Sequence, residues 1–148
     1  MQTVVNPLAP GAAVGVSEDM IRNLVHTFYA RVREDEVLGA IFNRVVGDWD
    51  EHLDKLCAFW SSVMLMTGRY KGAPMQVHAA LPEISTALFD RWLAIFRLAA
   101  TEVCPPPAAA LFIDRAERIA QSLVHGIAVH RGQFMGNGEF LTGGRGVS

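Results

Sequence analysis

The chain lacks any long run of apolar residues, although 51% of its 148 residues are hydrophobic. A helix that crosses a membrane needs about 20 consecutive apolar residues, so we expect no membrane span. The N-terminus MQTVVNPLAPGAAVGV has neither the basic start nor the apolar block of a secretory signal. A formal net charge of −2 does not indicate a positively charged surface that would bind nucleic acid or a membrane. We therefore expect a cytoplasmic domain that binds neither of these.

Cysteine is scarce, and several common site signatures are missing. Cys57 and Cys104 are far apart and form no CxxC pair, so we expect two reduced thiols that serve as small apolar residues. The CxxCH motif for covalent cofactor attachment is absent. No Glu stands three residues before His52, His78 or His125, as a di-iron helical bundle would require. Clustered zinc ligands, a Ser or Cys nucleophile signature and a Gly-rich phosphate loop are absent as well.

Strand patterns are also missing, because no segment alternates apolar and polar residues between hairpin signals. Apolar residues recur instead at steps of three and four, which predicts an all-α domain with four substantial helices and a short fifth. The long helices are expected at residues 18–33, 48–67, 86–103 and 107–130, and the short one lies within 37–43. Ser17, Asp48 and Ser85 are suited to cap three of the long helices.

The two ends of the chain differ from its middle. Residues 1–16 are rich in Ala, Gly, Val and Pro, and we expect them to be a flexible lead-in. Residues 132–148 are Gly-rich and show no periodicity, so a flexible tail is expected there. The folded domain is predicted to span residues 17–131. The last helix carries no continuous apolar seam on its surface, which favours a monomer.

A short segment between the second and third long helices holds one histidine. In the sequence GRYKGAPMQVHAALP, a helical pattern stops at Gly68, Pro74 opens a short segment, and Pro82 closes it. His78 lies inside this segment, so one imidazole stands between two prolines that bound a short element. Such a histidine is either a ligand or, more commonly, an ordinary core or surface residue, and spacing alone leaves both interpretations open.

Three other residues place a polar aromatic group on an apolar helix face. Tyr29, His52 and Trp92 each occupy the helical stripe that faces the core. A buried phenol, imidazole or indole needs a hydrogen-bond partner. Each residue taken alone is an ordinary core residue, or a Tyr whose hydroxyl reaches the surface. The three become a candidate site only if they face the same cavity as His78.

These residue types together suit haem that is bound without a covalent link. Such haem needs one imidazole for the iron, a flat apolar slot, cations for two propionates and distal hydrogen-bond donors. His78 could supply the imidazole, and Tyr29, Trp92 and His52 could supply the donors. The slot and the cations could come from Phe42, Leu56, Phe59 and Leu81, and from Arg69 and Lys71.

The order of these motifs resembles the truncated haemoglobins, and within them group III, the branch first noted in proteobacteria. The resemblance covers about residues 17–131. HTFYARVREDEVLGAIF is similar to the distal-tyrosine helix with its following corner, and WDEHLDKLCAFW is similar to the distal helix. GRYKGAPMQVHAALP resembles the proximal segment, and FDRWLAIF carries the distal tryptophan. The Gly-Gly pairs typical of groups I and II are missing from these places, and a distal His is typical of group III.

The resemblance implies a bacterial protein with a two-over-two helical sandwich around haem b. His78 would be the proximal iron ligand, and His52 would lie at the distal position, where it could also bind ferric iron. Tyr29, Trp92 and His52 would stabilise a bound ligand. The haem-contacting residues that it implies are His78, Phe42, Leu56, Phe59, Arg69, Tyr70, Lys71, Val77, Leu81 and Trp92.

The expected function is binding of O₂ and other small ligands, namely NO, CO, cyanide or peroxide, with slow release. Two donors on the ligand would make release too slow for bulk oxygen transport, so redox chemistry or ligand scavenging is favoured. A peroxidase, an NO dioxygenase or an NO reductase would need an external electron donor. The alternatives are a haem-based gas sensor without turnover and a haem-free helical interaction module.

Overall fold

The computed structural model describes residues 7–71 and 85–136, with side chains in the second range as far as Gly126. The described elements are a 3₁₀ turn and five α-helices, and no strand occurs among them. They are η1 (Ala12–Val14), α1 (Glu18–Glu34), α2 (Leu38–Val45), α3 (Trp49–Leu65), α5 (Thr86–Val103) and α6 (Pro106–Gly136). None of the described helices is both long enough and apolar enough to cross a membrane.

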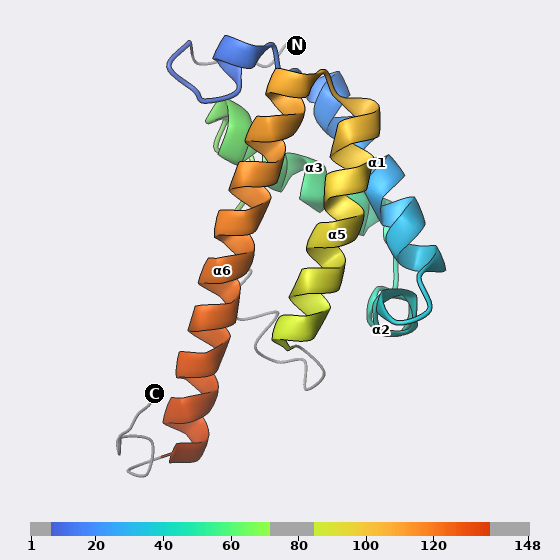
Figure 1. Cartoon of the computed structure of the whole chain (residues 1–148), viewed down its shortest axis with the longest axis vertical. Helices are drawn as coiled ribbons and strands as arrows, with labels where there is room; N and C mark the ends of the chain where they lie inside the picture. Colours follow the sequence, from blue (N-terminus) through green and yellow to red (C-terminus); the bar gives the residue numbers. More distant parts are fainter. Residues whose placement is uncertain (1–6, 72–84, 137–148) are drawn as a thin grey trace.

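The helices form two antiparallel pairs, which confirms the predicted two-over-two arrangement. In the first pair the end of α1 meets the start of α3, where Arg33 lies over the Trp49 ring. In the second pair α5 and α6 run side by side in opposite directions (Figure 1). α1 also packs against α5 and therefore joins the two pairs.

Side-chain caps begin three helices at the predicted places. The hydroxyl of Ser17 accepts the backbone N–H of Met20 at 3.1 Å, and the carboxylate of Asp48 accepts that of Glu51 at 3.1 Å. The hydroxyl of Ser85 does the same at the start of α5. Each cap supplies an acceptor to a backbone donor that the first turn of a helix leaves without an intrahelical partner. The caps therefore fix where α1, α3 and α5 begin.

The lead-in and the last helix differ from expectation. The N–H of Gly11 donates to the carbonyl of Met64 at 2.8 Å, so the segment before α1 is attached to the end of α3. Ala9 and Val16 are buried on either side of this contact. The described part of the predicted lead-in is therefore packed, while the domain boundary at residue 17 stays a prediction. α6 extends to Gly136, beyond the predicted end at residue 130.

Large aromatic side chains fill the space between the two pairs. Phe28, Phe96 and Phe112 are among the largest fully buried side chains. The ring of Trp60 stacks on that of Phe96, with centroids 5.4 Å apart. Contacts of this kind combine burial of apolar surface with a preferred ring geometry. Both cysteines are free and buried, and burial raises the pKa of each thiol, which agrees with their predicted role as small apolar residues.

Asp35 connects α1, α2 and α5 at one point. Its Oδ2 accepts the backbone N–H groups of Val37 and Leu38 at the start of α2. The same oxygen accepts Nε of Arg91 on α5 at 2.7 Å. The Arg91 guanidinium is the main cause that lowers the pKa of this carboxyl, and the two backbone N–H groups also lower it. Asp35 thus holds α2, which carries Phe42, against the α1–α5 contact.

Candidate functional site

Tyr29 and Trp92 come together where α1 and α5 cross. Tyr29 is 5% exposed, and a hydrogen bond links its side chain to that of Trp92. Because the indole N–H can only donate, the phenol oxygen is the acceptor of this bond. Phe28 supports the arrangement, since its ring lies 5.3 Å from Trp92 and 4.6 Å from Tyr29 by centroid distance. The phenol keeps its own O–H as a donor for a further acceptor.

The Tyr29 hydroxyl is held in its neutral form. Burial raises the pKa of this group to about 12, although the hydrogen bond with Trp92 acts in the opposite direction. Burial has this effect because it disfavours the charged phenolate. The O–H is therefore present as a donor throughout the neutral and mildly alkaline range.

Stability at high pH should report this burial directly. An exposed tyrosine in the unfolded chain titrates near pH 10, whereas Tyr29 titrates at about 12 in the fold. Between these values the unfolded chain loses the proton first, so the free energy of unfolding should fall by about 1.4 kcal/mol per pH unit. Below pH 10 this contribution should not change with pH. Urea unfolding measured from pH 8 to 11.5 should show this fall in the free energy of unfolding in the wild type and a smaller fall in Tyr29→Phe. An equal dependence of the unfolding free energy on pH in the two proteins would contradict the prediction.

His52 joins this pair from α3. Its ring centroid lies 6.0 Å from that of Tyr29, and the two ring planes are nearly perpendicular at 87°. The Nε2 atom of His52 is removed from solvent. Phe42 on α2 approaches the other side of the cluster, with its ring 5.9 Å from Tyr29. The structure thus brings together the three polar aromatic residues that the sequence singled out, next to the phenylalanine predicted beside them.

Trp49 belongs to this cluster, although it was not among the site residues predicted from the sequence. Its ring lies 5.5 Å from His52, 6.3 Å from Tyr29 and 6.5 Å from Phe42 by centroid distance. The spacing of three residues between Trp49 and His52 was the available signal, because residues three apart share a helix face. This signal could not identify the neighbours that α1 and α2 supply.

The predicted apolar residues of α3 pack against the core. Leu56 and Phe59 are half-buried there. Trp60, the next residue, is fully part of the core at 3% exposure. Phe59 contacts the ring of Tyr70 at 5.3 Å, so these two predicted haem-contacting residues lie together.

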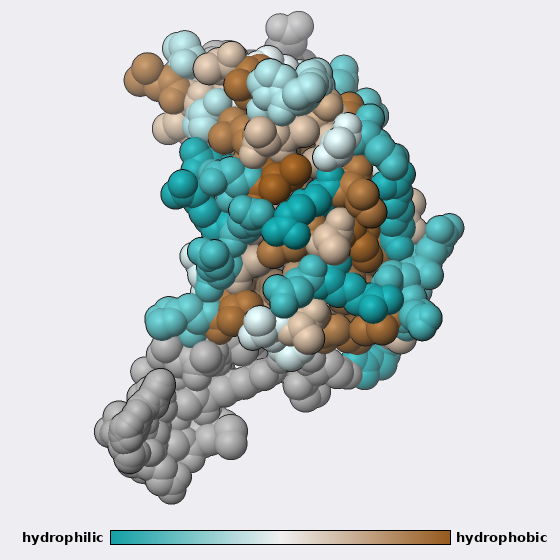
Figure 2. All heavy atoms as spheres, in the orientation of Figure 1, coloured by the Kyte–Doolittle hydropathy of each residue, from teal (hydrophilic) through white to brown (hydrophobic). Residues whose placement is uncertain are grey.

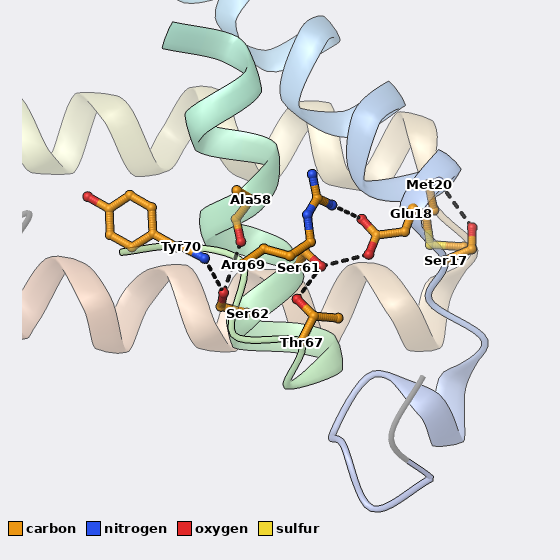
Figure 3. A network of polar contacts seen from close by, with 9 residues as sticks. All are labelled: Ser17, Glu18, Met20, Ala58, Ser61, Ser62, Thr67, Arg69 and Tyr70. Atoms are coloured by element: carbon orange, nitrogen blue, oxygen red, sulfur yellow. Dashed lines mark hydrogen bonds and ion pairs between the residues drawn. The ribbon is translucent and has the colours of Figure 1, made fainter. Parts of the chain in front are cut away.

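A polar network fixes the chain after α3 (Figure 3). Arg69 donates from Nη1 to Oε1 of Glu18 at 2.7 Å, and the hydroxyl of Ser61 donates to Oε2 of the same carboxylate at 2.7 Å. The backbone N–H of Tyr70 donates to the hydroxyl of Ser62 at 2.9 Å. Arg69 is thus engaged with the start of α1, and Lys71 is exposed. Binding of propionates by these two cations stays a prediction.

The predicted iron ligand His78 lies outside the described residues, as do Val77 and Leu81. Within the described residues no group of three or more His, Cys, Asp and Glu side chains could hold a metal ion. A groove of about 710 Å³ between α5 and α6 contains none of the predicted site residues. Figure 2 shows this side of the molecule, where hydrophilic side chains interrupt the apolar surface. The Arg97–Glu117 ion pair, at 2.8 Å, lies in this groove.

The residues around Tyr29 fit a haem pocket by the chemistry of their donors. Tyr29, Trp92 and His52 place an O–H and ring nitrogens among aromatic side chains that are buried or half-buried. Haem requires this combination on its ligand side, where an apolar surface surrounds a few donors. The described side chains are therefore suited to form a distal wall, and the proximal imidazole is the predicted contribution of His78.

Comparisons with known proteins agree with this arrangement. The family model described as bacterial-like globin matches residues 12–124. The chain is 33% identical over 109 residues to the group 3 truncated hemoglobin ctb of Campylobacter jejuni subsp. jejuni, a match that covers 71% of this chain and 86% of the relative. The crystal structure of the group III truncated hemoglobin from Campylobacter jejuni superposes with a TM-score of 0.72 and 31% identity, covering 76% of this chain and 91% of the other. This chain therefore belongs to the bacterial-like globin family and, within it, to the group III truncated haemoglobins.

Proposed function

We propose that this protein binds haem b through His78 and holds O₂ or another small ligand at Tyr29, Trp92 and His52 with slow release. Membership of the truncated haemoglobins supports haem-based binding of small ligands in general. The hydrogen bond between the buried Tyr29 side chain and the half-buried Trp92 carries the finer proposal. Haem would supply the iron that binds the ligand and exchanges electrons with it.

The donors explain why release should be slow. A ligand that draws electron density from iron gains negative charge on its outer atom, and buried donors stabilise that charge. Each hydrogen bond to a charged group contributes about 1.5–3 kcal/mol, which corresponds to about one to two decades in the dissociation rate. The Tyr29 O–H is the donor best placed to act on the ligand, and the Trp92 indole N–H, which donates to the phenol oxygen, holds that O–H in place. Redox chemistry or ligand scavenging, with an external electron donor, suits such a site better than bulk oxygen transport.

Optical spectra of the purified protein test this proposal. We expect a Soret band in the ferric state, and a shifted band after reduction with dithionite and addition of CO. Stopped-flow mixing of the O₂ complex with excess CO should then show slow displacement of O₂. A protein that folds as a helical domain but takes up no haem would refute the proposal and favour the haem-free interaction module.

A further inference from the structure

Trp49 contacts both an exposed cation and the predicted distal histidine. Cζ of Arg33 is 4.5 Å from the centroid of the Trp49 ring, a cation–π contact. The ring planes of Trp49 and His52 meet at 88° with centroids 5.5 Å apart. Trp49 is half-buried and Arg33 is exposed, so this pair forms the boundary between the aromatic cluster and solvent.

The Arg33 end of this contact is held by α2. The side-chain Nδ2 of Asn43 donates to the backbone carbonyl of Arg33 at 3.2 Å. A Cβ on Gly39 would lie 2.5 Å from the same carbonyl oxygen, so only glycine allows α2 to approach this closely. The backbone from which the Arg33 side chain reaches Trp49 is therefore fixed by two contacts.

Two aromatic rings from different helices contact His52. Trp49 precedes it by one turn on α3, and Tyr29 faces it from α1 with a centroid distance of 6.0 Å. To leave this position, the imidazole must give up its edge contacts with both rings. We propose that Trp49 is a positioning residue: held by Arg33, its ring keeps the His52 imidazole against Tyr29 and so controls how readily a ligand reaches the distal side.

This inference rests on the proposed function, because it assigns Trp49 a role through His52 in ligand binding. Removing the Trp49 ring should free the imidazole and speed ligand association. An edge-to-face aromatic pair has an energy that corresponds to about a two- to tenfold change in rate. We therefore expect Trp49→Leu to bind CO about two- to tenfold faster than the wild type in flash photolysis. Trp49→Phe keeps an aromatic ring at this position and should bind CO at close to the wild-type rate.

A double-mutant cycle with His52→Ala separates positioning from simple obstruction. If Trp49 acts through His52, Trp49→Leu should add no further acceleration when His52 is already Ala. Equal acceleration in both backgrounds would overturn the inference, because Trp49 would then block the ligand by itself. Arg33→Gln, a change at an exposed position, should give a smaller acceleration and provides a second variant if Trp49→Leu does not fold. Arg33→Lys should restore the wild-type rate, because it keeps the cation.

Nuclear magnetic resonance of ¹³C-labelled histidine gives a readout that does not depend on rates. In the reduced, CO-saturated protein, His52 should give one sharp ring signal, identified by its loss in His52→Ala. Trp49→Leu should broaden or split that signal, whereas an unchanged signal would overturn the inference. A protein without a Soret band would refute the proposed function instead, and the same labelled histidine would then still report whether Trp49 restrains His52.

Discussion

Replacing Tyr29 with Phe is expected to speed O₂ release by about 10- to 100-fold, because one charge-assisted hydrogen bond to the ligand is lost. The substitution keeps the ring and its edge contacts with Phe28 and Phe42, at 4.6 and 5.9 Å. Packing should therefore change little. Stopped-flow displacement of O₂ by CO measures the effect, with association rates recorded beside it.

Trp92→Phe should accelerate release by about two- to tenfold, because the indole N–H that donates to the Tyr29 oxygen and orients its O–H is lost. The two side chains are hydrogen-bonded to each other, so their effects should not add in the double variant. Thr101→Val is a matched control, since it removes an exposed hydroxyl of α5 that bonds only to the Arg97 carbonyl of its own helix. Wild-type release rates in both single variants would rule out this explanation of slow release.

His78→Gly is expected to weaken haem binding by at least about tenfold, equivalent to about 1.4 kcal/mol, because the iron loses its protein ligand. The measurement is the loss or shift of the Soret band during haem titration. Added imidazole should restore the band, since a free imidazole can occupy the space that the side chain leaves.

His26→Ala provides the control for this experiment. His26 lies on the exposed side of α1, and we expect its removal to leave the Soret band unchanged. An unaltered band in His78→Gly would mean that another residue holds the iron. His52 would then be the next candidate, because its imidazole lies in the cluster around Tyr29.

Much of the fold could be predicted because its signals are local. The capping residues Ser17, Asp48 and Ser85 stand directly before helices whose apolar stripes repeat every turn. Tyr29 and Trp92 could be identified for a similar reason, since a polar ring in the middle of an apolar stripe is conspicuous. Their hydrogen bond with each other could not be predicted, because the apolar stripe of one helix does not show which residue of another helix faces it.

The features that could not be predicted depend on pairs distant in sequence. The propionate assignment of Arg69 stays a prediction, but its ion pair with Glu18, the first residue of α1, joins residues 51 positions apart and could not be predicted. The contact of Arg33 with Trp49 depends on how α2 fixes the end of α1. The end of α6 was placed too early because the glycines from Gly132 onward were taken as a tail without helical periodicity, whereas the helix continues to Gly136.

The packing of α1 against α3, its partner in the first pair, and against α5 of the second pair has a consequence during synthesis. A ribosome makes chains from the N-terminus, so α1 emerges first and its aromatic face remains incomplete until α5 follows. Phe28 and Tyr29 then stay open to chaperones or to other nascent chains while α2 and α3 are being made. The Tyr29–Trp92 pair of the predicted ligand site therefore forms only after α5 has been made.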